Sequence, residues 1–348
     1  MIEARQYVEE KGQNPKNLAL YGQENNGVTW SICKMNMILH DIPDAHIENE
    51  DTLTSPKFVE NGYVRQFDRV LANPPFSQNY TKANMQFPER FKYGFTPETG
   101  KKADLMFLQH MVASLKPDGI MASVMPHGVL FRGGQEKVIR EGMVKDDIIQ
   151  AIIGLPSKLF YNTGIPACVV VINKRKPEHL KNKILFINAD RDYGEGRNQN
   201  YLRPEDIEKI VTVFDNTLEI PKYSRLVDIK EIEENDFNLN IRRYVDNSPE
   251  PEIENVHYHI NGHISKQELE LYKQQMEKFN LKVDKLFTKI DKESLEFISD
   301  IDEKNKIKDV IENYEGVKKT YDRHFHKLND WWESVEKDIE KFPKNNNL

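Results

Sequence analysis

The 348-residue chain lacks the features that mark secreted, membrane-spanning and stand-alone DNA-binding proteins. Its only two cysteines, Cys33 and Cys168, lie in apolar stretches, so we expect buried thiols and neither a disulfide nor a metal site. No apolar run approaches the length of a membrane span and no signal-peptide pattern opens the chain, which favours the cytoplasm. The net charge of -7 argues against unaided binding to nucleic acid, because phosphate contacts need clustered lysine and arginine. A nucleic-acid function would therefore need a basic partner.

The most informative stretch joins a short apolar strand to a rigid turn. Residues 67–72 (FDRVLA) read as a buried strand, which Asn73-Pro74-Pro75-Phe76 stops abruptly. Ligands of open α/β sheets bind at the carboxyl ends of strands. There the oxygens of the Asn73 side chain and the Pro74 carbonyl can accept both hydrogens of an exocyclic amine, and Phe76 offers a face for a planar ring. The alternative is an ordinary turn, because Asn-Pro commonly opens turns.

Hydrophobic periodicity predicts an α/β fold. Strands are expected at residues 18–21, 47–53, 67–72, 120–125, 148–155, 167–173 and 184–188. Helices are expected at residues 2–11, 28–39, 105–115 and 204–214. Because several strands are apolar on both faces and alternate with helices, we expect a mainly parallel sheet that is covered on both sides. The long polar stretch 77–101 is expected to form a loop over the substrate.

Four further residues follow predicted strands or lie in the loops between them. Glu24 and Asp51 are placed to accept hydrogen bonds from the ribose and the adenine amino group of a nucleotide-like cofactor, although solvated loop positions are the alternative. His127 is expected to be a structural hydrogen-bonding group and not a proton carrier. Phe160 lies in a loop punctuated by glycine and proline, which favours an exposed aromatic over a core position.

The C-terminal third differs in pattern. A Pro- and Asn-containing stretch predicts a linker at residues 246–263. Apolar residues spaced three and four apart, at 269–290 and again at 307–335, predict a helical or coiled-coil hairpin over 264–348, packed on its own domain or on another subunit. His257, His259 and His263 lack a cysteine or an acid that would complete a ligand set, so we expect no metal.

The chain resembles the DNA-methylating subunit of type I restriction-modification systems, a family of adenine-N6 methyltransferases that use S-adenosylmethionine (AdoMet). The resemblance covers residues 1 to about 245. It rests on residues 21–25 (YGQEN), 34–40 (KMNMILH), 49–53 (NEDTL), 73–76 (NPPF), 125–134 (MPHGVLFRGG), 153–166 (IGLPSKLFYNTGIP) and, as the closing segment, 238–244 (NLNIRRY).

The resemblance implies a Rossmann-like class I AdoMet-dependent methyltransferase sheet over residues 1–245. It implies these site residues: Glu24 on the AdoMet ribose, Asp51 on its adenine, Asn73 beside the cofactor, Asn73, Pro74, Pro75 and Phe76 at the flipped target adenine, and Phe160 stacked on the same base. The implied partners are DNA, a specificity subunit, a restriction (motor nuclease) subunit and a second methylation subunit. No membrane contact is expected.

One departure from the family concerns the cofactor. The family carries a Gly-rich AdoMet loop, Asp-Pro-x-x-Gly-Ser-Gly, and a helical domain ahead of the helix at residues 2–11, and this sequence has neither. We therefore expect the C-terminal part of a longer protein, a sheet that is incomplete at its N-terminal side, and no activity from this chain alone. The predicted function is a site-specific adenine DNA methyltransferase subunit. The alternatives are a methyltransferase for a protein glutamine or an RNA base, and a non-catalytic fragment that only binds.

Overall fold

The computed structural model describes residues 1–160, 164–248, 256–299, 301 and 304–339. The chain divides into two compact units, Met1–Ser248 and Pro249–Leu348, and the division falls inside the expected linker. Residues 249–255 of that linker lie outside the described residues. Within the described part, no helix is both long and apolar enough to cross a bilayer.

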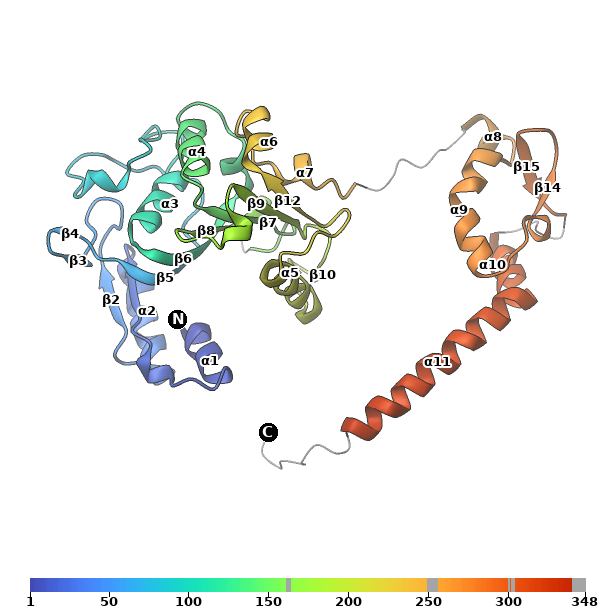
Figure 1. Cartoon of the computed structure of the whole chain (residues 1–348), viewed down its shortest axis with the longest axis horizontal. Helices are drawn as coiled ribbons and strands as arrows, with labels where there is room; N and C mark the ends of the chain where they lie inside the picture. Colours follow the sequence, from blue (N-terminus) through green and yellow to red (C-terminus); the bar gives the residue numbers. More distant parts are fainter. Residues whose placement is uncertain (161–163, 249–255, 300, 302–303, 340–348) are drawn as a thin grey trace. The chain divides into compact units, whose positions relative to one another are not determined.

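A six-stranded mixed sheet with the order β12-β9-β7-β8-β6-β5 forms the centre of the first unit (Figure 1). Its strands are β5 (Phe67–Ala72), β6 (Leu115–Pro126), β7 (Ile149–Gly154), β8 (Ala167–Asn173), β9 (Lys183–Asn188) and β12 (Ser224–Asp228). The pairs β5·β6 and β7·β9 are parallel, whereas β6·β8, β7·β8 and β9·β12 are antiparallel. The prediction of a mainly parallel sheet was wrong. Between β7 and β8 the described residues contain no crossover helix, so β8 returns antiparallel and pairs between β6 and β7.

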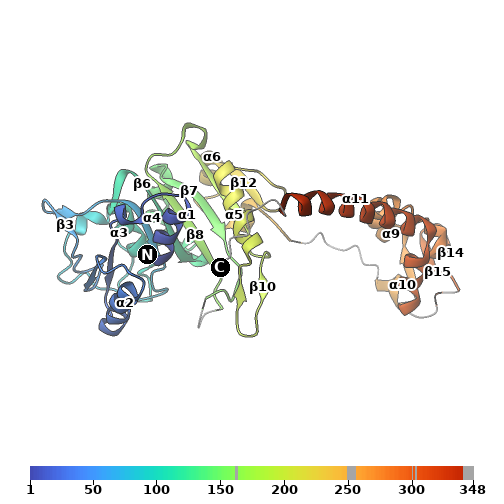
Figure 2. The ribbon, with the colours of Figure 1, turned by 90° about the horizontal axis from the view of Figure 1, so that it is seen from below.

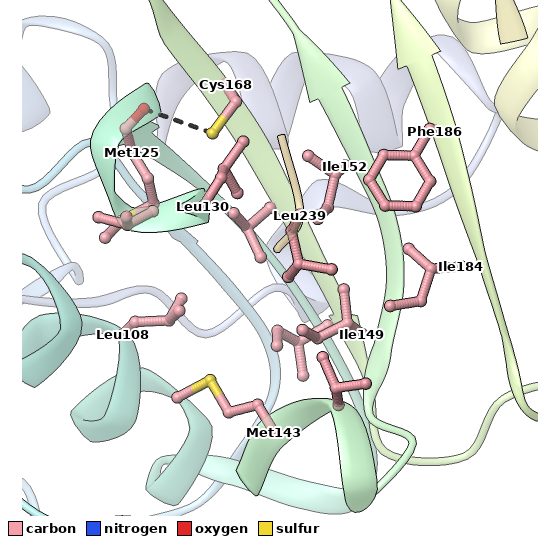
Figure 3. Close-up of a cluster of buried hydrophobic side chains, with 14 of the residues drawn as sticks. Leu108, Met125, Leu130, Met143, Ile149, Ile152, Cys168, Ile184, Phe186 and Leu239 are labelled. Atoms are coloured by element: carbon pink, nitrogen blue, oxygen red, sulfur yellow. Dashed lines mark hydrogen bonds between the residues drawn. The ribbon is translucent and has the colours of Figure 1, made fainter. Parts of the chain in front are cut away.

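Two apolar clusters cover the two faces of this sheet. On β8, Cys168, Val170 and Ile172 point into one cluster, while Val169 and Val171 pack in the other. The first cluster, shown in Figure 3, is completed by α3 (Asp104–Ala113), α4 (Gln135–Lys145), α6 (Ile229–Glu234) and α7 (Ile241–Tyr244). The second is closed by α5 (Pro204–Asn216), which is seen from below in Figure 2. The alternation follows from the two-residue period of a strand.

A separate two-stranded parallel sheet holds the N-terminal strands. It consists of β1 (Tyr21–Glu24) and β2 (His46–Asn49), with α1 (Ile2–Glu10) and α2 (Gly27–Leu39) beside them. The first strand therefore begins three residues later than the start of the predicted strand 18–21. The ring of Tyr21, at the start of β1, lies 5.1 Å from the ring of Phe67, at the start of β5. The two strands thus begin close together but belong to different hydrogen-bonded sheets.

The apolar face predicted for α2 is not the face that the first unit buries. The predicted stripe is between 61% and 76% exposed and comprises Val28, Ile32, Met35, Ile38 and Leu39. The buried side instead carries Trp30, Cys33 and Met37, and the Trp30 indole N–H donates to the carbonyl of Ile47 in β2 at 2.9 Å. Since the helix is apolar on both sides, periodicity alone could not identify its packed face.

Shorter elements complete the first unit. They are η1 (Pro15–Asn17), β3 (Val59–Glu60), β4 (Tyr63–Val64), η2 (Pro88–Arg90), η3 (His127–Leu130), η4 (Glu178–Leu180), β10 (Gly194–Glu195) and β11 (Asn200–Tyr201). Strands β3 and β4 form one hairpin, and β10 and β11 form another.

The second unit is a small α+β domain and not the predicted helical hairpin. Its elements are α8 (Val256–Ile260), β13 (His263–Ser265), α9 (Lys266–Lys278), η5 (Val283–Lys285), β14 (Phe287–Lys289), β15 (Ser294–Phe297), α10 (Lys304–Asn313) and α11 (Glu315–Ile339). The first apolar run stops being helical after α9, where Asn280 adopts a left-handed conformation with φ of 51°. Strands β13, β15 and β14 then form an antiparallel sheet. Only the second run is helical throughout most of its length, as α10 and α11.

Candidate active site at the carboxyl edge of the sheet

The Asn73-Pro74-Pro75-Phe76 turn follows the last residue of β5, which pairs in parallel with β6. The side chain of Asn73 is exposed, and those of Pro74 and Phe76 are half-buried. The strand 67–72 has the predicted bounds, but the prediction that it is buried was wrong, because β5 lies at the edge of the sheet and Leu71 is 73% exposed. The amide of Asn73 therefore faces solvent at the end of a sheet strand, where a ligand can reach it.

The buried carboxylate of Asp104 binds the backbone directly after this turn. Ser77, the residue after Phe76, has a left-handed φ of 54°, and its backbone N–H donates to Asp104 Oδ1 at 2.8 Å. Asp104 opens α3 and is only 1% exposed. Its other oxygen lies 3.3 Å from Arg132 Nη1, which also donates to Glu136 at 3.1 Å. The turn is thus tied to the loop that follows β6.

Burial raises the pKa of Asp104 above its ordinary value, while the Ser77 N–H and the Arg132 guanidinium oppose that rise. The buried carboxylate of Glu136 also raises this pKa, and it is itself paired with Lys102 Nζ at 2.8 Å. Sequence reasoning missed Asp104. The only signal was an acid at the start of an apolar helix, and such an acid is more often an exposed cap.

Two aromatic rings lie beside the turn. The ring centroids of Phe76 and Phe160 are 6.2 Å apart at an interplanar angle of 71°. Phe160 is half-buried and packs against the second apolar cluster, so it is neither fully exposed nor a core residue. The structure thereby brings together residues that are distant in the sequence, and both rings were predicted to belong to the site.

His127 belongs to the structural framework of this edge. Its backbone N–H donates to the carbonyl of Pro166 at 3.0 Å, which joins the loop after β6 to the start of β8. Burial lowers the pKa of the His127 ring, as does Arg242, and Asp190 acts in the opposite direction. A ring with a lowered pKa is neutral at pH 7. The structural role of the ring itself stays a prediction.

Glu24 is the last residue of β1, and Asp51 lies two residues beyond the end of β2, the parallel neighbour of β1. Glu24 ends β1 in register with Asn49, whose side-chain amide donates to the Glu24 carbonyl at 2.7 Å. One carboxylate oxygen of Glu24 accepts the Asn26 N–H at 2.7 Å, and one of Asp51 accepts the Leu53 N–H at 2.8 Å. A carboxylate has about four acceptor positions, so both groups keep capacity for a ligand. This pair fits the ribose and adenine of a nucleoside.

The histidines of the second unit show a different kind of contact. His259 Nε2 lies 2.7 Å from Glu268 Oε1. Among the described residues, no group of three or more His, Cys, Asp and Glu side chains could hold a metal ion. Cys168 is fully buried, as predicted, and burial raises the pKa of its thiol. Cys33 is only half-buried, so the prediction of a buried thiol was wrong there.

Comparison with known proteins gives consistent matches. The family model described as N-6 DNA Methylase matches residues 1–253. The type I restriction enzyme MjaVIII methylase subunit of Methanocaldococcus jannaschii is 41% identical over 260 residues, which are 70% of this chain and 44% of the relative. The MpnII methylase subunit of Mycoplasma pneumoniae is 36% identical over 245 residues, or 68% of this chain and 45% of the relative. The chain therefore spans a little under half the length of these curated relatives.

A solved structure agrees with the sequence matches. The methyltransferase subunit of a type I restriction-modification system from Streptococcus thermophilus superposes with a TM-score of 0.65 at 37% identity. The match covers 71% of this chain and 51% of that one. The mixed α/β architecture of the first unit is therefore shared with a methyltransferase fold.

Proposed function

Because the chain belongs to the N-6 DNA methylase family, we propose that its first unit is the catalytic domain of a site-specific adenine-N6 DNA methyltransferase in a type I restriction-modification system. The observation that carries the proposal is the Asn73-Pro74-Pro75-Phe76 turn at the carboxyl end of β5, with Phe160 close to Phe76. The matched relatives are named methylase subunits of type I restriction enzymes, which supports DNA over a protein glutamine or an RNA base as the acceptor.

Asn73 and Pro74 would act on the amino group of the target adenine. The lone pair of this nitrogen is delocalised into the ring, so the amine is a weak nucleophile. The side-chain oxygen of Asn73 and the carbonyl of Pro74 accept its two hydrogens, which draws the nitrogen toward tetrahedral geometry and stabilises its developing positive charge. Each such preorganised contact can be worth about 10²- to 10³-fold in rate.

Phe76 and Phe160 would hold the flipped base. Removing a base from the duplex costs a few kcal/mol. Stacking on an aromatic side chain returns roughly 1 to 3 kcal/mol per base. Two rings whose centroids are 6.2 Å apart can contact one base by a face and an edge, and the proline pair keeps Phe76 in place.

The cofactor would be AdoMet, which supplies an electrophilic methyl group when bound. Glu24 would accept hydrogen bonds from its ribose hydroxyls, and Asp51 would accept one from its adenine amino group. Both carboxylates lie at the ends of adjacent parallel strands and have unused acceptor positions.

The partners would be DNA, a specificity subunit, a restriction subunit and a second methylation subunit. The net charge of -7 supports a basic partner that carries much of the DNA contact. Helix α11 supports a protein contact, because its apolar residues are between 49% and 64% exposed: Tyr321, Phe325, Leu328, Trp331 and Trp332. We expect this stripe to pack on helices of the specificity subunit.

Methyl transfer by the complete methylation complex tests the proposal. We expect Asn73→Ala to lower transfer of tritiated methyl groups to DNA by at least about 10²-fold, with AdoMet binding and melting temperature unchanged. The matched control is Asn36→Ala, an exposed residue of α2 at which alanine is compatible with the helix. Near-normal transfer by the Asn73 variant would remove this turn from the active site.

A further inference from the structure

Hydrogen bonds join the loop between β5 and α3 to the turn that follows β2. The Gln86 N–H donates to the Thr54 carbonyl at 2.9 Å. Arg90 Nη1 donates to the Thr52 carbonyl at 3.0 Å, and Arg90 Nη2 donates to the Leu53 carbonyl at 2.7 Å. These contacts join positions between 32 and 38 residues apart in the sequence. The loop after the Phe76 turn is therefore bonded to the turn that carries Asp51.

Arg90 has the geometry of a rigid clamp. It is 5% exposed, and its remaining bonds also go to neutral acceptors: Nε donates to the Phe87 carbonyl at 3.0 Å and Nη2 to the Gln86 carbonyl at 3.0 Å. Nη1 lies 2.6 Å from His110 Nδ1. Burial lowers the pKa of His110 to about 3, so the neutral ring accepts this bond. A planar guanidinium with donors in a fixed fork suits such a set of acceptors, and a lysine could not reach all of them.

The Asp51 turn is closed from within as well. Asp51 accepts the Leu53 N–H with its side chain and the Ser55 N–H at 2.8 Å with its carbonyl. Asp51 therefore holds the turn through hydrogen bonds within residues 51–55, and Arg90 holds it through hydrogen bonds from the loop between β5 and α3. Arg90 binds the backbone carbonyls of Thr52 and Leu53 beside Asp51, and the charge of the nearby Asp51 carboxylate opposes the lowering of the Arg90 pKa that burial causes.

We propose that Arg90 is a positioning residue, which fixes the Asp51–Leu53 backbone in the shape that receives an adenosyl group and couples that turn to the loop following Phe76. The inference rests on the proposed function, since it takes Asp51 as the contact to the cofactor adenine. It adds a physical connection between the cofactor side and the target-base side of the site. Through Gln86 and Arg90, a change at one turn is transmitted to the other.

Hydrogen exchange by mass spectrometry, in the complete methylation complex, tests the inference with AdoMet as the probe. In the wild type, AdoMet should slow exchange in peptides that span residues 50–56. Arg90→Met should speed exchange there without AdoMet and raise the AdoMet concentration for half-protection about tenfold, the cost of one bond to a charged group. Arg69→Met is the control, because the Arg69 side chain is exposed and, within the described part of the chain, donates to the neighbouring Asp68 carbonyl at 2.8 Å.

A double-variant cycle separates positioning from general support. We expect Asp51→Ala and Arg90→Met each to raise the half-protection concentration about tenfold. If Arg90 acts through Asp51, the double variant should also show a rise of only about tenfold. Independent effects would multiply to about a hundredfold and would overturn the inference. If Arg90→Met does not fold, Arg90→Lys carries the same test, because lysine keeps the charge but loses the fork.

The remaining outcomes are also decisive. Equal half-protection in the wild type and the Arg90 variant would overturn the role of Arg90 and leave the cofactor assignment intact. No protection of residues 50–56 by AdoMet in the wild type would overturn the assignment of Asp51 to the cofactor, and the inference with it. The two failures are therefore distinguishable from one data set.

Discussion

Asp104 offers the sharpest test of how the site is held, because two substitutions there should change stability by clearly different amounts. Asp104→Ala removes the acceptor of the Ser77 N–H and one of the two carboxylates that face Arg132. Asp104→Asn keeps an oxygen that can accept from Ser77 but removes the buried charge. A comparison of the two variants therefore separates the hydrogen bond from the ion pair.

The expected magnitudes follow from these contacts. Removing one partner of a buried pair costs about 3 to 5 kcal/mol of stability. Arg132 keeps Glu136 and is 30% exposed, so we expect Asp104→Ala to lie at the lower end, near 3 kcal/mol. Asp104→Asn should stay within about 1 kcal/mol of the wild type, because neutralising a buried charge of raised pKa offsets the lost attraction to Arg132.

The pH dependence has a definite sign. Burial raises the pKa of Asp104 in the folded state above the unfolded value of about 3.9, so the folded state binds this proton more readily. Its contribution to stability is then largest at low pH and is lost as pH rises through the folded pKa. The wild type should therefore gain stability relative to Asp104→Asn as pH falls from 7 toward 4.

Urea unfolding followed by circular dichroism at several pH values provides the measurement, and hydrogen exchange at Ser77 reports the turn itself. Asp118→Asn, at an exposed acid in the β6 segment, is the matched control and should change stability by less than about 0.5 kcal/mol. The reasoning is refuted if Asp104→Asn destabilises as much as Asp104→Ala and the gap to the wild type widens with rising pH. That result would mean that the attraction to Arg132 outweighs burial.

Three further predictions concern the base, the partner and the cofactor. Phe160→Ala should weaken DNA binding and turnover by roughly 1 to 3 kcal/mol, and a stability loss of about 3 to 5 kcal/mol in thermal melting would instead indicate a core residue. Phe325→Glu with Trp332→Glu should release the specificity subunit in a pull-down while the circular dichroism spectrum is unchanged; retention of the complex would exclude the α11 stripe as the contact. The 348-residue chain alone should bind AdoMet very weakly and not methylate DNA, because Glu24 and Asp51 would contact one side of the cofactor only. A micromolar dissociation constant by calorimetry would contradict this.

Local sequence determined the strands that carry the chemistry. The bounds predicted for 67–72 and 167–173 are those of β5 and β8. Proline removes a donor and fixes the backbone, so the prolines at residues 74, 75 and 166 bound these two short apolar runs. The same local rules placed Asn73 and Phe76 directly after β5, at the carboxyl end that ligands use.

Local sequence also carried the family identity, but it could not assign partners across the sheet. The position of β8 between β6 and β7 depends on hydrogen bonds between segments, which no single run of residues encodes. In the second unit, spacings of three and four continued past Lys278, yet the chain leaves the helix at Asn280 and pairs into a sheet. The same apolar residues can form one face of a strand or one face of a helix, and tertiary packing decides which of the two forms.

The residues that support the site depended wholly on the tertiary structure. Asp104 stands 27 positions from Ser77, and Arg90 stands 38 positions from Thr52. In the sequence, each is one charged residue among many, and most such residues are solvated. Only the fold removes water from them and brings specific carbonyl and amide groups within bonding distance, and this burial gives a single acid or arginine its role.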